Sequence, residues 1–129
     1  KSDLESLAFE LEGGASPETE PDRVRVLAAR VPLDVKQLQE LCRRLTRTSG
    51  RVAVLVSEAE ETGRAIVGSS SPQVDAARVL AAMLPEFSGK GGGNPSVATA
   101  KGEPGAALER ALEAGRKAAE AQATAAVGR

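Results

Sequence analysis

The chain has 129 residues, a formal net charge of −1 and only two aromatic side chains, both Phe. This length allows one domain with its own core, which Val, Leu, Ile and Ala must fill. The sequence has no His, which excludes His-dependent catalytic triads and zinc sites, and no apolar run of the roughly 20 residues that span a bilayer. We therefore expect neither such catalysis nor a membrane partner.

Charge is distributed unevenly along the chain. Residues 1–22 hold seven acids and one base, residues 23–54 eight bases and two acids, residues 55–88 five acids and two bases, and residues 89–129 six bases and four acids. A basic block in a nearly neutral chain can bind a polyanion locally. The alternative is that these Arg and Lys residues form an ordinary solvated surface, and charge alone favours that alternative.

The first segment is predicted to be the end of a longer helical element. Its apolar residues recur at helical spacing until Gly13 and Gly14, where a helix would stop. Residues 13–22 are polar and contain two Pro, so residues 1–22 are interpreted as the end of a helix followed by a linker. Because the sequence does not begin with Met, we expect a piece of a longer protein. The helical spacing joins Leu4, Leu7, Ala8 and Leu11.

A strand and a helix are predicted next. Residues 23–31 alternate as a strand does, and Pro32 stops them. Asp34 with Gln37 three positions later predicts a capping box, which starts a helix that runs to about Ser49. The predicted buried stripe consists of Val35, Leu38, Leu41, Cys42 and Leu45, and the basic side chains that lie off it are Lys36, Arg43, Arg44 and Arg47.

Cys42 lies within that stripe, so we expect a buried structural thiol and not a nucleophile. A single Cys cannot form an internal disulfide, and the sequence has no His to activate the thiol. Cysteine usage therefore favours a reducing compartment, and we expect a cytoplasmic protein.

The middle of the chain predicts a hairpin and a second helix. Residues 52–57 form an apolar run typical of an interior strand, residues 58–63 a polar turn, and residues 64–68 the returning strand. Ser71 and Pro72 are predicted to begin the helix, which Pro85 ends. The predicted buried face of this helix consists of Val74, Ala77, Leu80, Ala81 and Leu84.

A glycine-rich stretch follows at residues 88–95, where Lys90 alone interrupts the glycines at positions 89 and 91–93. Since glycine weakens regular structure, the run predicts a loop that takes positive φ or comes close to another group. Its unhindered amides and the Lys90 ammonium would suit an anion. The spacing fits neither the P-loop nor the dinucleotide fingerprint. A flexible surface loop is the alternative.

The end of the chain predicts a short strand at residues 97–100 and a last helix that Pro104 opens and that frays past Ala121. The order β-α-β-β-α-Gly-rich loop-β-α predicts a single α/β domain over residues 23–120, with a frayed tail at 121–129. Its mixed sheet should have about four to five strands with helices packed on it. The inward residues of the last helix are predicted to be Ala107, Leu108, Ala111 and Leu112.

The stretch SGKGGGNPSVATAKG at residues 88–102 resembles the glycine-rich signature of the C-terminal, DHH-associated domain of alanyl-tRNA synthetases and related alanyl-tRNA editing proteins. Two upstream stretches resemble that family's strand–helix unit and its hairpin: VRVLAARVPLDVKQLQELCRRL and VAVLVSEAEETGRAIVGSSS. The resemblance covers about residues 23–118. The related DHH phosphoesterases usually carry Gly-Gly-His at this place, so Pro95 and the lack of His favour the synthetase branch.

The resemblance implies a non-catalytic domain that binds tRNA, expected to be tRNA-Ala, at its outer elbow. Other domains of the parent, an alanine ligase or an alanyl-tRNA deacylase, would charge and edit. We expect no catalytic residue, metal or cofactor in this piece. Recognition should rest on phosphate and shape, because the chain offers few aromatics for base stacking. The candidate contacts are Gly89, Lys90, Gly91, Gly92, Gly93, Asn94, Arg43, Arg44 and Arg47.

Two other functions remain open from the sequence. The first is a homodimer or interdomain scaffold, in which residues 4–11 and the Ala-rich last helix pack against a partner. The Ala residues of that helix are Ala107, Ala111, Ala114 and Ala118, and they are also typical of an ordinary helix on a sheet. The second is a nucleotide phosphoesterase, or the substrate-binding domain of a DHH phosphoesterase. Phosphoesterase catalysis needs clustered Asp and His for metals, and this sequence has no His and no DHH motif.

Overall fold

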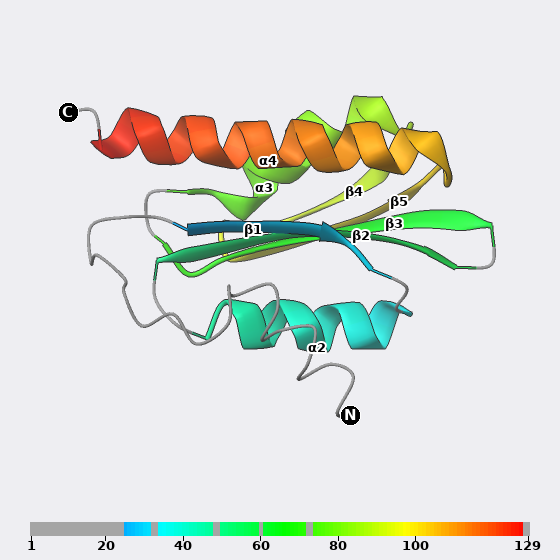
Figure 1. Cartoon of the computed structure of the whole chain (residues 1–129), viewed down its shortest axis with the longest axis horizontal. Helices are drawn as coiled ribbons and strands as arrows, with labels where there is room; N and C mark the ends of the chain where they lie inside the picture. The colour runs from blue at the N-terminus through cyan, green and yellow to red at the C-terminus, as the bar shows by residue number, and fades with distance from the viewer. Residues whose placement is uncertain (1–24, 32–33, 48–49, 60, 72–73, 128–129) are drawn as a thin grey trace.

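In the computed structural model the described residues are 25–31, 34–47, 50–59, 61–71 and 74–127. They form three layers, with two helices on one face of a sheet and one helix on the other (Figure 1). The predictions made for residues 1–22 lie outside the described residues.

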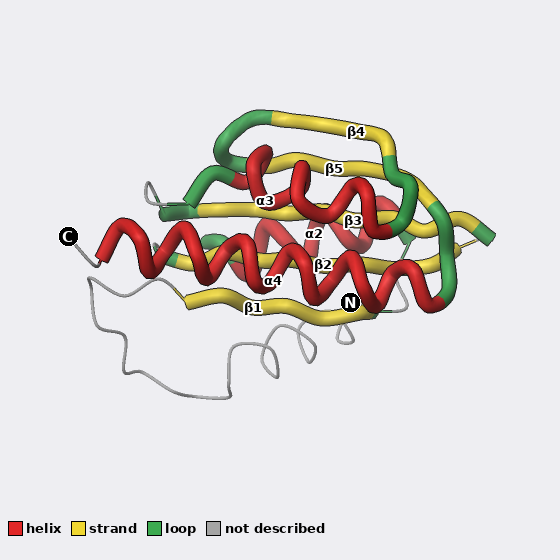
Figure 2. The backbone as a smooth tube through the Cα atoms, turned by 90° about the horizontal axis from the view of Figure 1, so that it is seen from above, coloured by secondary structure: helices red, strands yellow, loops and turns green. Residues whose placement is uncertain are grey.

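One five-stranded mixed sheet forms the middle layer, as the sequence predicts. Its order is β1-β2-β3-β5-β4, in which β1 and β2 are parallel and the other neighbours are antiparallel. Figure 2 shows β1 and β4 at the two edges. The strands are β1 (Arg25–Arg30), β2 (Arg51–Ala59), β3 (Thr62–Ser69), β4 (Lys90–Gly93) and β5 (Val97–Gly102).

The helices divide the apolar residues into two cores. One core lies between the sheet and the pair α3 and α4, and the other lies between the sheet and α2. On the first face α4 packs against β1 and β2, and α3 packs against β3, β5 and β4. On the second face α2 packs mainly against β2 and β3. The helices are α2 (Val35–Leu45), α3 (Ala76–Met83), the 3-10 turn η1 (Leu84–Glu86) and α4 (Ala106–Val127).

The predicted capping box starts α2. The backbone N–H of Gln37 donates to the Asp34 carboxylate at 2.8 Å, and the backbone N–H of Asp34 donates to the Gln37 amide oxygen at 3.2 Å. The helix ends at Leu45 and not near Ser49, because Thr46 caps it and turns its hydroxyl to the Cys42 carbonyl at 2.8 Å.

The exposure of Val35 also differs from the prediction for α2. Leu38, Leu41, Cys42 and Leu45 are buried as predicted, but Val35 is 41% exposed. It occupies the first helical position, beside a hollow in the surface. The buried stripe of α2 therefore begins one turn later than expected.

The second helix begins later than the sequence suggests. Asp75, and not Ser71, is the N-cap of α3, and its carboxylate accepts from the backbone N–H of Ala77 at 2.9 Å. Ser71 is buried before the helix, where its backbone N–H donates to the Ser69 hydroxyl at 3.2 Å. The buried stripe includes Val79 and Met83, while the predicted Ala81 is exposed. Val and Met bury more apolar area than Ala, which favours the orientation of α3 in which Val79 and Met83 face the core.

The last helix runs to Val127, well past the predicted fraying at Ala121. Ala is the strongest helix former, and the helix is tied to α3 because the Asp75 backbone N–H donates to the Gln122 side chain at 2.9 Å. Gly115 lets α4 approach the sheet closely, since a Cβ there would lie 2.8 Å from a Val54 methyl.

The Ala face of α4 packs inside the chain. Ala107 and Ala111 are buried in the core, and Ala118 is half-buried against it. The ordinary alternative for these residues, a helix lying on its own sheet, is therefore the one observed.

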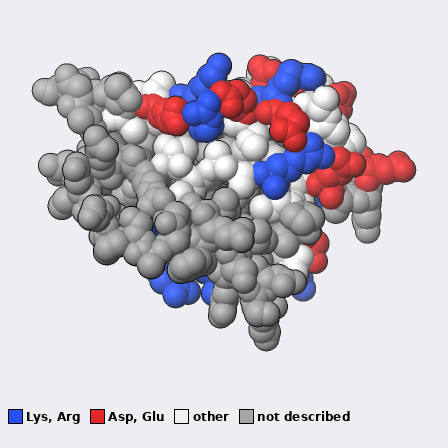
Figure 3. All heavy atoms as spheres, viewed as in Figure 1, with Lys and Arg blue, Asp and Glu red and all other residues white. Residues whose placement is uncertain are grey.

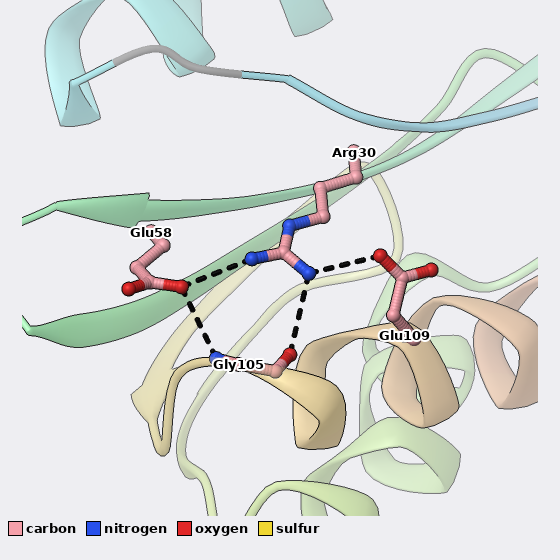
Figure 4. A network of polar contacts seen from close by, with 4 residues as sticks. All are labelled: Arg30, Glu58, Gly105 and Glu109. Carbon is pink, nitrogen blue, oxygen red and sulfur yellow. Dashed lines mark hydrogen bonds and ion pairs between the residues drawn. The ribbon is translucent and has the colours of Figure 1, made fainter.

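A polar network fixes the start of α4 against the sheet (Figure 4). The Arg30 guanidinium donates to Glu58 and to Glu109 at 2.9 Å each, and to the Gly105 carbonyl at 3.3 Å. Glu58 also accepts from the Gly105 backbone N–H at 3.1 Å. Gly105 has φ of 78°, a left-handed conformation that favours glycine. The network joins β1, β2 and α4.

Candidate nucleic-acid interface

The glycine-rich segment is an edge strand and not the loop that the sequence predicts. It forms β4, which pairs antiparallel with β5, and all four of its residues are exposed. A tight turn connects the two strands: the Asn94 side chain accepts from the backbone N–H groups of Ser96 at 2.8 Å and Val97 at 3.0 Å. Asn at the first and Pro at the second position are typical of such a turn.

Close approach, and not positive φ, accounts for two of these glycines. A Cβ on Gly91 would lie 2.1 Å from the Thr99 carbonyl oxygen, and one on Gly93 would lie 2.3 Å from the Val97 carbonyl oxygen. Among the described residues, the glycines with positive φ lie at positions 50 and 105, outside this strand. The backbone of β4 therefore lies against β5 more closely than side chains would allow.

Strand register places three cations in a row. Lys90 lies opposite Lys101 across β4 and β5, and Lys101 lies opposite Arg64 across β5 and β3. Directly opposed residues share a face of the sheet, and like charges in that arrangement repel. Within the described parts of the chain, none of the three forms an ion pair. An anion bound beside this row would relieve the repulsion.

The row lies in a groove beside α2. Because α2 packs mainly against β2 and β3, the described residues leave the same face of β5 and β4 open, where Val97, Thr99 and Lys101 are exposed. Two hollows of about 330 Å³ and about 370 Å³ lie along this opening and share Gln39, Ile66 and Thr99. We call this continuous depression the α2 groove. The first hollow also contacts the three cations, and the second also contacts Arg43, Cys42 and Val97.

Several predicted contact residues meet in the α2 groove. Lys90, Gly91 and Gly92 line its first hollow, and Arg43 lines its second. Lys101 and Arg64 line it too but were missed, because their alignment with Lys90 depends on strand register. The remaining predicted contacts line neither hollow; they are Gly89, Gly93, Asn94, Arg44 and Arg47.

Arg43 and Arg44 are not equivalent. Both approach the Glu40 carboxylate, Arg43 at 3.3 Å and Arg44 at 3.4 Å. The Arg43 side chain is 73% exposed, whereas the Arg44 side chain is 28% exposed. Exposed pairs of this kind are weak, so Arg43 can exchange its carboxylate partner for another anion.

The outer surface of α4 differs from the α2 groove in charge. Figure 3 shows acidic and basic side chains mixed along the upper edge, over α4. Arg116 pairs with Glu113 and, at 3.0 Å, with Glu120. The hydrogen bond from Arg116 lowers the pKa of the Glu113 carboxyl below its usual value. Arg116 is therefore already neutralised by acids on its own helix.

The family of this chain is shown by a match to a protein-family model. A model of the DHHA1 domain matches residues 23–121. The chain belongs to the DHHA1 domain family. This confirms the family that the glycine-rich stretch and its upstream elements indicated.

Relatives of this DHHA1 domain agree with that assignment. It is 33% identical over 122 residues to the alanine–tRNA ligase of Stenotrophomonas maltophilia (strain K279a), and 33% identical over 121 residues to that of Xanthomonas campestris pv. campestris (strain B100). The alignments cover 87% and 86% of this chain but 14% of each ligase. The chain thus spans about a seventh of the length of these relatives.

A solved structure confirms the fold. The C-Ala domain from Aquifex aeolicus alanyl-tRNA synthetase superposes with a TM-score of 0.63 at 19% sequence identity, covering 79% of this chain and 96% of that domain. The predicted mixed α/β sheet with packed helices is therefore correct. In the described part of this DHHA1 domain, no helix has the length and hydropathy that crossing a membrane requires.

Proposed function

We propose that this DHHA1 domain is a non-catalytic module that binds tRNA in the α2 groove. The observation that carries the proposal is the row of Arg64, Lys101 and Lys90, which lie side by side without ion-pair partners among the described residues. The similarity to alanine–tRNA ligases supports tRNA, and tRNA-Ala in particular, as the polyanion.

The groove suits the backbone of a folded RNA. Folded RNA is recognised mainly through its shape, its phosphates and its 2′-hydroxyls. Lys90 and Lys101 supply point charges, and Arg64 can bind a phosphate through two N–H groups. Backbone amides of an edge strand partly face away from the sheet, so β4 adds uncharged donors. No aromatic side chain lines either hollow, which disfavours stacking of splayed bases.

The parent protein in this proposal is an alanine–tRNA ligase. Its other domains carry out aminoacylation and editing, while this domain holds the outer elbow of the tRNA in the cytoplasm. The domain itself acts without a cofactor. A free-standing alanyl-tRNA deacylase is the alternative parent, and the names of the relatives favour the ligase.

Removal of the cation row tests the proposal. In the variant Arg64→Ala, Lys101→Ala, Lys90→Ala we expect the Kd for a tRNA-Ala transcript to rise about 100-fold at low salt, because each lost phosphate contact costs on the order of 1 kcal/mol. Fluorescence anisotropy of labelled transcript measures the Kd.

A matched variant controls for net charge. Arg78, Arg110 and Lys117 are exposed on α3 and α4, and their replacement by Ala removes the same three charges. This variant should bind tRNA almost as well as the unchanged chain. Equal weakening by both variants would show that overall charge, and not the α2 groove, governs binding.

A further inference from the structure

Gly92 differs from Gly91 and Gly93 because neither close packing nor backbone conformation requires glycine at this position. A Cβ added to Gly91 or Gly93 would collide with the backbone of β5, whereas a Cβ added to Gly92 would meet nothing within 4 Å. Gly92 also lacks the positive φ that favours glycine, which among the described residues is found at other glycines. Glycine weakens a strand, so its presence at an open strand position needs another cause.

The missing side chain of Gly92 leaves space in the α2 groove. Gly92 lines the first hollow, two residues along β4 from Lys90 and opposite Thr99 on β5. Residues two apart on a strand share a face, so a side chain at Gly92 would stand beside the row of cations. Thr99 is exposed, and its hydroxyl can donate to an RNA oxygen.

We propose that Gly92 is the point at which the sugar–phosphate backbone of bound RNA lies directly against the protein. This inference rests on the proposed function. It names the residue that determines how closely RNA approaches the protein surface. The RNA backbone crosses the sheet over Gly92 and Thr99, with its phosphates within reach of Lys90 and Lys101. Absence of a Cβ at a backbone contact is a common use of glycine.

A comparison of two Gly-to-Ala variants separates this role from a structural one. Gly92→Ala adds one methyl group to the α2 groove, and Gly91→Ala adds one toward β5. Thermal unfolding should show that Gly92→Ala melts at or above the temperature of the unchanged 129-residue chain, because Ala limits the unfolded chain more than Gly does. Gly91→Ala should melt at a lower temperature.

Binding of a labelled tRNA-Ala transcript is then measured by anisotropy. For Gly92→Ala we expect the Kd to rise about tenfold. The added methyl group holds the RNA backbone away from its hydrogen-bond donors and so weakens those hydrogen bonds. Gly92→Val, with a larger side chain that suits strands, should weaken binding further while the fold is retained.

Four results would overturn the inference. Unchanged tRNA affinity in Gly92→Ala and Gly92→Val would remove the contact. A fall in melting temperature equal to that of Gly91→Ala would show that the fold itself needs this glycine. Failure of the unchanged chain to bind tRNA would overturn both the inference and the proposed function. Loss of binding in the three-cation variant together with full binding by Gly92→Ala would overturn the inference alone.

Discussion

At the scale of the single residue, Cys42 shows how packing controls chemistry. The thiol is buried beneath α2, and Gly68 lacks a side chain because a Cβ there would lie 2.4 Å from the sulfur. Burial disfavours the thiolate and raises the pKa of Cys42 from 9.0 to about 11, although the nearby Arg43 lowers it slightly. The thiol is therefore structural, as the apolar stripe of the sequence predicted.

Cys42 should react slowly in the folded protein. We expect the disulfide reagent DTNB to label it at neutral pH only after denaturant is added, because the folded thiol is buried and protonated. Since its folded pKa is raised, its contribution to stability is full below pH 9.0 and is lost as pH rises through about 11. Rapid labelling under native conditions would contradict this account.

Some residue roles were readable from the sequence and others were not. The Asp34 and Gln37 capping box depends on local spacing alone, so it was predicted correctly. Ser71 was predicted to cap α3, but Ser71 is buried before the helix and Asp75 is the N-cap. Lys101 and Arg64 could not be assigned to the site, because only the register of β3 with β5 brings them to the same row.

At the scale of the element, β4 is the segment that the sequence predicted to be a loop and that the structure shows to be a strand. Glycine has low strand propensity, so a segment of one Lys and three Gly resembles a loop. Tertiary context overrode that propensity: the turn after β4 returns the chain along the open edge of β5, where close backbone approach requires glycine. The Asn-Pro pair at positions 94 and 95 was the available signal.

The turn between β4 and β5 can be tested at Asn94. Asn94→Ala removes the acceptor for the Ser96 and Val97 backbone N–H groups, so we expect a loss of about 1 kcal/mol in the free energy of unfolding. Hydrogen exchange should become faster in β4 and β5 but not in β1 or β2. Asn94→Asp keeps the acceptor oxygens and should resemble the unchanged chain. Uniform exchange rates in Asn94→Ala would show that this turn does not hold β4.

At the scale of the whole molecule, the two faces of the sheet are covered unequally. Among the described residues, α3 and α4 cover one face from edge to edge, whereas α2 packs mainly against β2 and β3 on the other. The apolar patterns along the chain predicted the sheet and its helices, since each must bury one face. It did not predict which half of a face stays open, because that depends on where α2 packs.

The burial of Ala residues on α4 leads to a prediction of the assembly state. Because Ala107, Ala111 and Ala118 pack within the chain, they are not available to a second copy. We expect light scattering to give a monomer of 13.3 kDa at high micromolar concentration. A stable dimer mass would favour the scaffold alternative and would mean that surfaces other than these Ala residues form the interface.

The salt dependence of tRNA binding tests the central claim most directly. Each phosphate that a cation neutralises contributes to the slope of log K against log salt concentration. The unchanged chain should show a steep slope, and the variant lacking Arg64, Lys101 and Lys90 should show a slope that is smaller by about 2 to 3. The control variant lacking Arg78, Arg110 and Lys117 should keep the original slope. Identical slopes for all three proteins would contradict binding of RNA phosphates by the α2 groove.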